Sequence, residues 1–365
     1  MVTISGRYRD LMTSHRPASD QPPASLPATR GQAAALLDPA TRDQVAATVQ
    51  ASKAANTLRA YQSDLRQVAR WLAEHGRGDL VTSNGAGLWL LCGAVPVELL
   101  AGYLVQRAEQ GATVATLRRH LASVSKWHQW AGVENPCSST LVRDTLAGLR
   151  RLRPRAPRRA APLLPDDLAR LVAGCDPNTA SGVRDRALLL LGWCAALRRS
   201  ELAALTWGQV ESVQGGLLLT VQGSKTDRSG EGQQVGVPYQ ASPELCPVRA
   251  LHAWRQLLDL HAWQGQLAQL DPAAPVFRQV SRAGTVLDAP LSGQAVAQVV
   301  QRRAATLGLR LSGHSLRAGL ATAAIAAGRS EHDVMRTTRH RSQAVFRGYV
   351  RDAELLPKAA SRGLL

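Results

Sequence analysis

The sequence lacks the cysteine patterns that mark zinc sites and disulfide frameworks. Its five cysteines are scattered along 365 residues, and none forms a CxxC pair. The odd number and the wide spacing argue against structural zinc and against a disulfide scaffold, and they fit a reducing compartment. The five are Cys92, Cys137, Cys175, Cys194 and Cys246.

Signals for export and membrane insertion are also missing. The N-terminus has no basic stretch followed by an apolar run, so it does not resemble a signal peptide. The most hydrophobic window, residues 87–105, contains Pro96 and Glu98, which predicts a loop followed by a helix rather than a membrane span. We therefore expect a cytoplasmic protein without a membrane partner.

Acidic residues are scarce relative to basic ones. The chain has 27 Asp and Glu against 44 Lys and Arg, a formal net charge of +17. Such an excess favours a polyanionic partner, because a cationic surface releases the counterions that surround nucleic acid. A merely basic protein and a protein attracted to anionic lipid are the alternatives. Most of the positive charge is arginine, which binds phosphate in a bidentate way, so we favour nucleic acid.

The chain divides into segments by composition, and we see no internal repeat. Residues 1–38 are rich in Pro, Ala, Ser and Arg, which predicts a disordered tail. Residues 39–149 have helical periodicity. Residues 150–162, "RRLRPRAPRRAAP", contain three prolines and six arginines, which predicts an extended basic linker. Residues 163–350 form the second domain, and residues 351–365 form a C-terminal tail.

Two stretches predict secondary structure clearly. "TVATLRRHLASVSKWHQWAG" has an apolar stripe that includes Leu117, Val124 and Trp127, which predicts an amphipathic helix. "GLLLTVQGSKTDRSGEGQQVGVP" predicts a hairpin, with strands near Leu217–Gln222 and Gln233–Pro238. Two apolar helices are expected to meet near Leu197, and the remainder of the second half is mostly helical.

Seven polar residues lie at expected helix starts and turns of the second half of the chain. Individually each is weak: "LRRSEL" can be an ordinary helix start, and a tyrosine near a helix end usually packs. A metal site at His314 is disfavoured because only two other histidines are near, with no Cys or Asp at ligand spacing. His314 and Arg317 are three residues apart, so on a helix they share a face. The set comprises Arg198, Glu201, Lys225, His314, Arg317, His340 and Tyr349.

Taken together and in this order, these residues resemble the tyrosine recombinase (phage integrase) family. That family has an Arg, a Glu three residues later, a hairpin Lys, an HxxR pair, a His or Trp, and a Tyr nine residues further. "SGHSLRAGL" and "TLRRHL" are most similar to Cre-type recombinases. The resemblance spans residues 45–355 and implies a mainly α two-domain protein: an all-helical, SAM-like core-binding domain and an α+β catalytic domain with a small β-sheet. One departure is Arg339, where the family usually has glycine, and this puts the backbone near His340 in question.

The residue types suit phosphoryl transfer. A phosphodiester gains negative charge on its non-bridging oxygens in the transition state, and preorganised cations there lower the barrier. Arg198 and Arg317 fit this role because a guanidinium is always charged and donates to two oxygens. His314 can donate to the same oxygens or accept the nucleophile's proton, since imidazole titrates near neutrality.

The resemblance assigns the remaining roles. Tyr349 is the nucleophile, Lys225 protonates the leaving 5′-hydroxyl, and His340 adds a hydrogen bond to the phosphate. Glu201 is expected to orient a neighbour such as His314. The family's product is a 3′-phosphotyrosyl linkage that conserves the bond energy, so no cofactor and no metal are implied.

The resemblance also implies partners. We expect double-stranded DNA with paired inverted half-sites, a homo-tetramer on that DNA, and a nucleoid-associated protein of bacterial, phage or plasmid origin. The C-terminal tail, residues 351–365, is expected to dock on a neighbouring protomer, with docking onto its own domain as the alternative. The candidate DNA-binding residues are Lys53, Arg59, Arg118, Arg119, Lys126 and Gln294.

Two other functions are compatible with part of the pattern. A type IB topoisomerase uses a similar residue set but relaxes supercoils without exchanging partners, and the compact helical first domain and the chain length disfavour it. A catalytically silent DNA-binding relative would keep the fold, but the complete catalytic set disfavours that as well.

Overall fold

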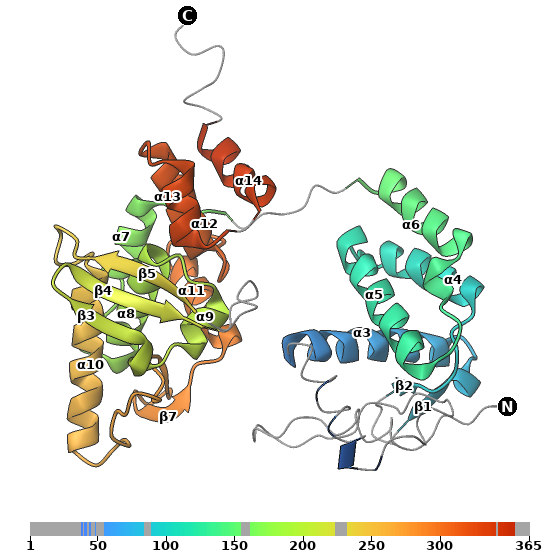
Figure 1. The fold of residues 1–365 in the computed structure, drawn as a ribbon, viewed down its shortest axis with the longest axis horizontal. Helices are drawn as coiled ribbons and strands as arrows, with labels where there is room; N and C mark the ends of the chain where they lie inside the picture. The colour runs from blue at the N-terminus through green and yellow to red at the C-terminus, as the bar shows by residue number, and fades with distance from the viewer. Residues whose placement is uncertain are drawn as a thin grey trace, which may run out of the picture. The chain divides into compact units, whose positions relative to one another are not determined.

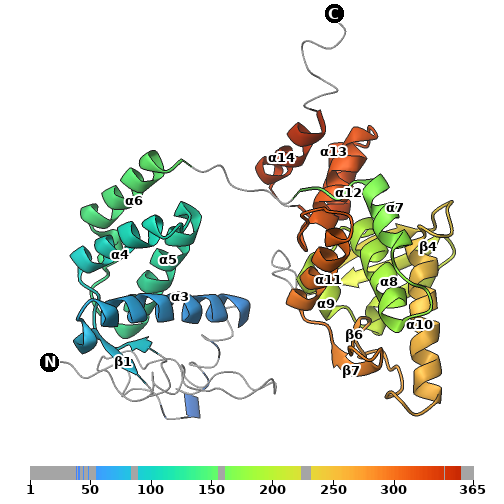
Figure 2. The ribbon, with the colours of Figure 1, turned by 180° about the vertical axis from the view of Figure 1, so that it is seen from behind.

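The computed structural model of the chain forms two compact units, residues 1–157 and 158–365. Figures 1 and 2 show both units from opposite sides. The division lies inside the segment 150–162 that the sequence predicts to be a linker. The structure describes residues 38, 40, 41, 44, 48, 55–83, 89–154, 161–222, 232–340 and 342–354. The predicted tail 1–38 lies outside these residues except for Asp38.

The first unit is mostly helical, as predicted, but it also contains a short antiparallel pair of strands. In β1 and β2, Val81 lies opposite Leu91. Leu90 and Leu91 are buried, so this apolar run fills the core against α3. The expectation of an all-helical first domain is therefore corrected. The elements are α3 (Ala55–Glu74), β1 (Val81–Ser83), β2 (Trp89–Leu91), α4 (Val97–Glu109), α5 (Val114–Ala131) and α6 (Thr140–Leu152).

Helix α5 illustrates how local sequence sets an element of this unit. The hydroxyl of Thr113 accepts a hydrogen bond from the backbone N–H of Thr116 and caps the start of the helix. Gly132 ends it in the left-handed conformation, with φ of 64°. Between these caps, Leu117, Val124 and Trp127 of the predicted stripe are buried in the core.

Helix α6 extends into the segment predicted to be a linker. It ends at Leu152, and the N–H of Arg153 still bonds the carbonyl of Leu149. The prediction of extended chain from Arg150 is therefore wrong at its start. Arg150 and Arg151 lie in the last turn, where the helix dipole stabilises basic side chains. Pro154 is the first residue that cannot continue the helix.

The second unit combines helices with small antiparallel sheets, which confirms the predicted fold class. Its helices are α7 (Pro165–Ala173), α8 (Ala180–Cys194), α9 (Arg199–Ala204), α10 (Pro247–Trp263), α11 (Gly293–Ala305), α12 (Ser315–Ala326), α13 (Glu331–Thr338) and α14 (Gln343–Glu354). Its strands are β3 (Val210–Val213), β4 (Gly216–Val221), β5 (Gln233–Pro238), β6 (Arg278–Val280) and β7 (Val286–Pro290).

The predicted hairpin is confirmed as β4 and β5, which pair antiparallel with Leu219 opposite Val235. Strand β3, which the sequence did not predict, adds to the other edge of β4. Leu217, Leu219 and Val221 alternate along β4 and are buried in the core shared with α8 and α10. Alternation of this kind is the signature of a strand with one face on a core.

Helix α8 is the centre of the second unit. Four successive leucines, residues 188–191, are all at most 1% exposed, so the helix is covered on every side. It packs against α10 and α12. It ends at Cys194, and α9 begins at Arg199, which confirms the junction predicted near Leu197. The short connection is thereby held rigidly between two packed helices.

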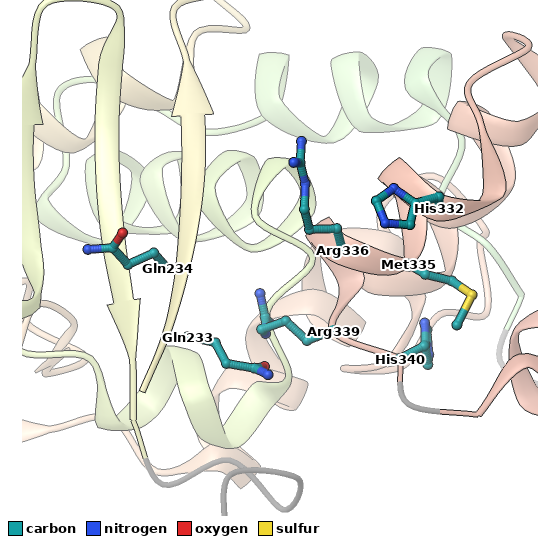
Figure 3. Close-up of a pocket in the computed structure, with 7 residues that line it drawn as sticks. All are labelled: Gln233, Gln234, His332, Met335, Arg336, Arg339 and His340. Atoms are coloured by element: carbon teal, nitrogen blue, oxygen red, sulfur yellow. The ribbon is translucent and has the colours of Figure 1, made fainter. Parts of the chain in front are cut away.

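A cavity of about 510 Å³ lies between β5 and α13. Figure 3 shows Gln233 and Gln234 on the strand side, and Arg336, Arg339 and His340 on the helix side. His332 and Met335 complete the lining, so the cavity combines polar groups with apolar surface.

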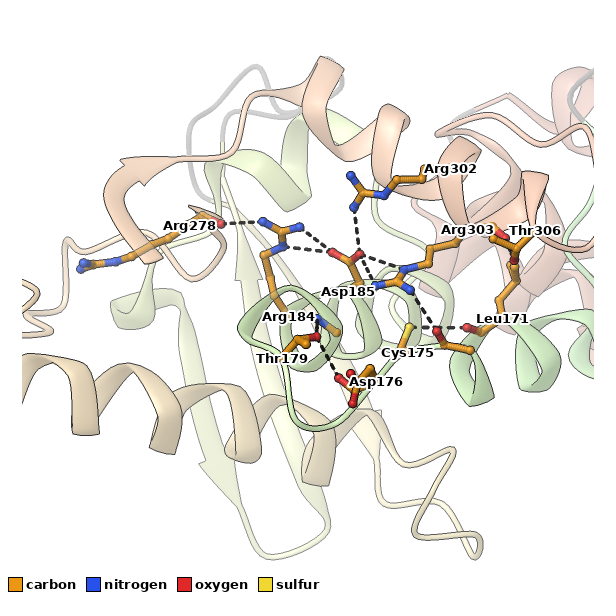
Figure 4. Close-up of polar contacts among 12 residues, drawn as sticks. Leu171, Cys175, Asp176, Thr179, Arg184, Asp185, Arg278, Arg302, Arg303 and Thr306 are labelled. Atoms are coloured by element: carbon orange, nitrogen blue, oxygen red, sulfur yellow. Dashed lines mark hydrogen bonds and ion pairs between the residues drawn. The ribbon is translucent and has the colours of Figure 1, made fainter. Parts of the chain in front are cut away.

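Asp185 joins three arginines inside the second unit (Figure 4). Its side chain is fully buried, and it accepts hydrogen bonds from Arg184 of the same helix at 2.7 Å. Arg302 and Arg303 of α11 reach its other oxygen at 3.1 and 3.0 Å. Arg303 also donates to the carbonyl of Gly174, beyond the end of α7, at 2.9 Å. The carboxylate therefore ties α8, α11 and the end of α7 together.

Replacing Asp185 by asparagine is expected to lower the free energy of unfolding by ~3–5 kcal/mol, because it leaves buried guanidinium charge without its counterion. Urea unfolding of the full chain measures the loss. Asp259→Asn is the matched control: Asp259 is exposed, and its pair with Arg255 of α10 should contribute less than about 1 kcal/mol. Equal unfolding midpoints for the two variants would contradict this role for Asp185.

Candidate active site

Arg198 lies at the end of the tight turn that joins α8 to α9. In this turn Ala196 has a φ of 48°, a left-handed conformation that is uncommon for a residue with a side chain. Ala195 and Leu197 on either side are buried, so packing holds the turn in place. Such backbone strain persists only where the surroundings over-determine it, and it concentrates at functional sites. The turn presents Arg198 as the residue that caps α9, with its side chain 25% exposed.

Glu201 holds Arg198 from the first turn of α9. One carboxylate oxygen accepts the backbone N–H of Arg198 at 2.8 Å, and the other accepts its guanidinium. The first oxygen also accepts a bond from Arg339 at 2.7 Å. Burial by itself would raise the pKa of Glu201, but the charge of Arg339 and the bonds from Arg198 outweigh it and lower that pKa. The expectation that Glu201 orients His314 is corrected, since its partners are these two arginines.

Helix α12 carries the HxxR pair and packs unusually close to the start of the second unit. A Cβ at Gly319 would lie 2.0 Å from the carbonyl oxygen of Leu163, so only glycine fits. The same carbonyl accepts the indole N–H of Trp193 at 2.8 Å, and the N–H of Leu163 bonds the carbonyl of Ser315 at 3.0 Å. Gly319, the second glycine of the "SGHSLRAGL" motif, therefore serves packing, and it fixes the position of the helix that presents His314 and Arg317.

Arg317 is a buried cation, and one of its guanidinium nitrogens has no hydrogen-bond partner within the described residues. It is 1% exposed and donates from Nη1 to the carbonyl of Ala196 at 2.8 Å. Its Nη2 is buried and has no hydrogen-bond partner within the described residues. Burial, together with the charges of Arg198 and Arg339, lowers the pKa of Arg317 to about 9. A desolvated guanidinium with an unused N–H favours an anion, because the anion supplies the missing bond and the missing counter-charge.

His314 and Tyr349 contact each other beside Arg198 and Arg317. Nε2 of His314 lies 2.8 Å from the hydroxyl oxygen of Tyr349 on α14. Desolvation of the imidazole and the charges of Arg317 and Arg198 lower the pKa of His314, so its neutral form prevails at pH 7. A neutral imidazole has one nitrogen that accepts, and in the tautomer with the proton on Nδ1 that nitrogen is Nε2, within reach of the phenol proton.

His340 lies beside the same tyrosine. Its ring centroid is 5.5 Å from that of Tyr349, and its Nδ1 is 2.8 Å from the hydroxyl of Thr338. Burial and the nearby cations, Arg317 foremost, lower the pKa of His340 to about 3, so it is neutral. The contact with Thr338 fixes the orientation of the ring. The structure thus gathers five of the predicted residues with Glu201: Arg198, His314, Arg317, His340 and Tyr349.

Arg339 belongs to the same group, although its residue type did not mark it as functional. It takes the left-handed conformation, with φ of 55°, so the backbone keeps the geometry that glycine would adopt there. Its side chain is buried and contacts Glu201. In the sequence, the only sign that Arg339 belongs to the site was its departure from the family's glycine. That sign concerned the backbone and did not predict an ion pair.

Several candidates are placed differently. Lys225, between β4 and β5 in the sequence, is outside the described residues. Lys53, which precedes α3, is outside them as well. In the first unit Arg119 donates two bonds to the buried Asp64, at 2.7 and 3.0 Å, so its guanidinium holds α5 to α3. Lys126 is half-buried, 5.4 Å from the ring centroid of Trp130. Arg59, Arg118 and Gln294 are exposed.

Among the residues that the structure describes, no three His, Cys, Asp or Glu side chains gather as metal ligands. No helix in the described part of the chain is both long and apolar enough to cross a bilayer.

Known proteins resemble this chain in sequence and in structure. Residues 162–355 match the phage integrase family. An integrase/recombinase XerD homologue of Selenomonas ruminantium is 31% identical over 83% of this chain and 84% of its own length. The fold is similar to XerH recombinase bound to a palindromic difH substrate, with a TM-score of 0.54 and 13% identity over 90% of this chain and 86% of XerH. It is also similar to a lambda integrase dimer bound to a COC′ core site, with a TM-score of 0.53 and 17% identity over 83% and 74%.

The family match covers the helices and strands that carry Arg198, the HxxR pair and Tyr349. The similarity to the XerD homologue continues through most of both units. The chain therefore belongs to the phage integrase family and is a tyrosine recombinase that cleaves and rejoins DNA.

Proposed function

We propose that this recombinase acts at specific DNA sites through a covalent 3′-phosphotyrosyl intermediate on Tyr349. The observation that carries the proposal is the 2.8 Å contact between His314 and the hydroxyl of Tyr349, beside two arginines. A nucleophile within hydrogen-bond reach of a neutral base is the arrangement that such catalysis requires.

The chemistry proceeds by one exchange of bonds at phosphorus. The non-bridging oxygens of the scissile phosphate bind Arg198 and the unused N–H of Arg317. The Tyr349 oxygen bonds to phosphorus as the bond to the 5′-oxygen breaks, and His314 takes the phenol proton. Lys225 supplies a proton to the departing 5′-hydroxyl. Rejoining reverses each step, so the linkage conserves the energy of the phosphodiester.

His340 adds a hydrogen bond to the phosphate from the side of Tyr349. Its low pKa supports a neutral ring, which orients the phosphate without adding charge. Arg198 and Arg317 already repel each other in the absence of DNA. A protonated His340 would add a further positive charge and increase this repulsion.

Trapping on a nicked duplex tests the proposal. A site is first selected from a pool of random duplexes by the full-length chain, and a nick is placed beside the cleavage position so that the cut strand is lost. A DNA adduct on a peptide containing Tyr349, identified by mass spectrometry, supports the intermediate. Absence of an adduct on every selected site would favour a catalytically silent relative. Exchange between two sites on one plasmid separates recombination from the relaxation that a type IB topoisomerase performs.

We further propose assembly as a homo-tetramer on paired inverted half-sites. The palindromic substrate of XerH and the dimer of lambda integrase on its core site support a two-fold arrangement. In this proposal the tail, residues 351–365, docks on a neighbouring protomer. α14 continues to Glu354, and the rest of the tail lies outside the described residues. The likeness to Cre-type enzymes and a cytoplasmic, nucleoid-associated place of action belong to the same proposal.

Gln294 is proposed to contact a base from the start of α11. It is exposed, and the cap of this helix is Ser292, whose hydroxyl accepts the N–H of Ala295 at 3.1 Å, so Gln294 is not needed as a cap. Glutamine pairs with adenine and arginine with guanine. Gln294→Arg is therefore expected to shift preference toward guanine at one position by ~1–3 kcal/mol.

Site selection followed by sequencing measures this shift. Gln301→Arg, which adds the same charge at an exposed position near the other end of α11, is the control. Identical base preferences for the Gln294→Arg variant and the parent would rule out a base contact by Gln294.

A further inference from the structure

Arg339 is a buried cation held in a conformation that disfavours it. It ends α13 with φ of 55° and ψ of 41°, a left-handed geometry that is unfavourable for a residue with a side chain. The residue is only 5% exposed. Burial of a guanidinium on a strained backbone requires compensating contacts, and most of these lie in the turn and helix start that present Arg198.

The guanidinium of Arg339 donates to four acceptors. Nη2 bonds the carboxylate of Glu201 at 2.7 Å and the carbonyl of Ala196 at 3.3 Å. Nη1 bonds the carbonyls of Ala195 at 3.2 Å and Thr337 at 3.1 Å. Three of the four acceptors thus belong to the turn and helix start that present Arg198, and only one belongs to its own helix.

These acceptors are the groups that hold the two phosphate-binding arginines. The Glu201 oxygen that accepts from Arg339 also accepts the backbone N–H of Arg198 at 2.8 Å. The carbonyl of Ala196 also accepts Nη1 of Arg317 at 2.8 Å. One side chain from the end of α13 therefore contacts both supports, which lie 138 and 143 residues earlier in the sequence.

We propose that Arg339 is a positioning residue of this recombinase, which holds Glu201 and the Ala195–Ala196 turn so that Arg198 and Arg317 converge on one phosphate. The proposal rests on the proposed function, since it concerns the phosphate bound for attack by Tyr349. Arg339 does not touch the phosphate, and it acts through Glu201 and the turn.

A pH profile distinguishes positioning from a purely structural role. The charged groups that face Glu201 are Arg198, Arg317 and Arg339. Burial raises the pKa of Glu201, and Arg339 is the largest influence that lowers it. Without Arg339 that pKa rises, so as pH falls Glu201 is protonated earlier and releases Arg198. Cleavage by an Arg339 variant is therefore expected to fall at a higher pH than cleavage by the parent.

Arg339→Gly is the decisive variant, because glycine adopts the left-handed backbone freely and only the side chain is lost. Its control is Arg329→Ala, which removes the same charge from an exposed position just before α13. Adduct formation on the nicked selected site is timed for both variants, together with DNA affinity and melting temperature. Arg339→Gly is expected to slow adduct formation about 10- to 100-fold, within the range of couplings between contacting residues. Its DNA affinity should match that of the control. Its melting temperature falls because the buried ion pair with Glu201 is lost, so the rates are compared at a temperature where both variants are folded.

Two further variants test the route of the effect. In a Glu201→Gln background, Arg339→Gly should have a much smaller effect, because the shared support is already weakened. Arg339→Lys keeps the charge but cannot reach Glu201 and the carbonyls together, so it should restore part of the rate and of the parent's pH profile.

The outcomes separate the proposals. Parent-like cleavage by Arg339→Gly overturns the positioning role, and so does a DNA affinity, or a folded fraction at the assay temperature, that falls in step with the rate. No recovery of rate in a stable Arg339→Lys variant also overturns it. A parent chain that forms no Tyr349 adduct would overturn the proposed function itself, and the positioning role with it.

Discussion

Replacement of Tyr349 by phenylalanine is expected to abolish the covalent protein–DNA adduct while leaving binding to the selected site nearly unchanged. The substitution removes one oxygen, the atom that lies 2.8 Å from Nε2 of His314, and keeps the ring that packs beside Phe346 and His340. No other proposed group can form the bond to phosphorus. Denaturing electrophoresis of radiolabelled nicked duplex, with and without protease, measures the adduct.

Tyr239→Phe provides the control for this experiment. Tyr239 follows β5 and is 45% exposed, away from the His314–Tyr349 pair in the sequence and in contacts. It should form adduct at the parent rate. A protease-sensitive adduct that persists in Tyr349→Phe would show that another residue is the nucleophile.

Replacement of Arg198 by lysine is expected to slow cleavage by about 10²–10³, the usual cost of removing one transition-state donor. Lysine keeps the charge but presents a single ammonium, which cannot donate along two directions to phosphate while remaining on Glu201. The side chain of Arg198 is 25% exposed. Its bond to Glu201 fixes the orientation of the guanidinium. Single-turnover cleavage of the nicked duplex at saturating protein measures the step.

The neighbouring Arg199 supplies the matched control for this substitution. It is exposed at the first position of α9, and Arg199→Lys changes the same chemical group one residue away. Its cleavage rate should stay close to that of the parent. If Arg198→Lys also cleaves at the parent rate, Arg198 does not stabilise the transition state.

Much of the fold followed from local patterns. The stretch "GLLLTVQGSKTDRSGEGQQVGVP" predicted the hairpin of β4 and β5, and an apolar stripe predicted α5 with its inward Leu117 and Trp127. These predictions succeed because side-chain periodicity is set by backbone geometry within a few residues. Local patterns failed where short apolar runs were ambiguous: the β1–β2 pair was missed because its strands have only three residues each.

The candidate site shows the same limit. The order of residue types along the chain indicated Arg198, His314, Arg317, His340 and Tyr349, and tertiary packing brings these together in the second unit. Residue type alone did not show that Arg119, a candidate DNA contact, also forms an ion pair within the first unit. It forms two bonds with Asp64, a partner 55 residues away whose burial no local pattern shows.

By itself, the sequence determined the family and the mainly helical class and indicated the candidate catalytic residues, because these depend on composition, short-range periodicity and the order of motifs. Only the tertiary structure decided which charges neutralise one another. Glu201 pairs with Arg198 and with Arg339 rather than with His314, because packing brings the end of α13 against the turn before α9. Ion pairs inside a protein depend on the distance and burial of groups far apart in the chain, and both arise only when the core has formed.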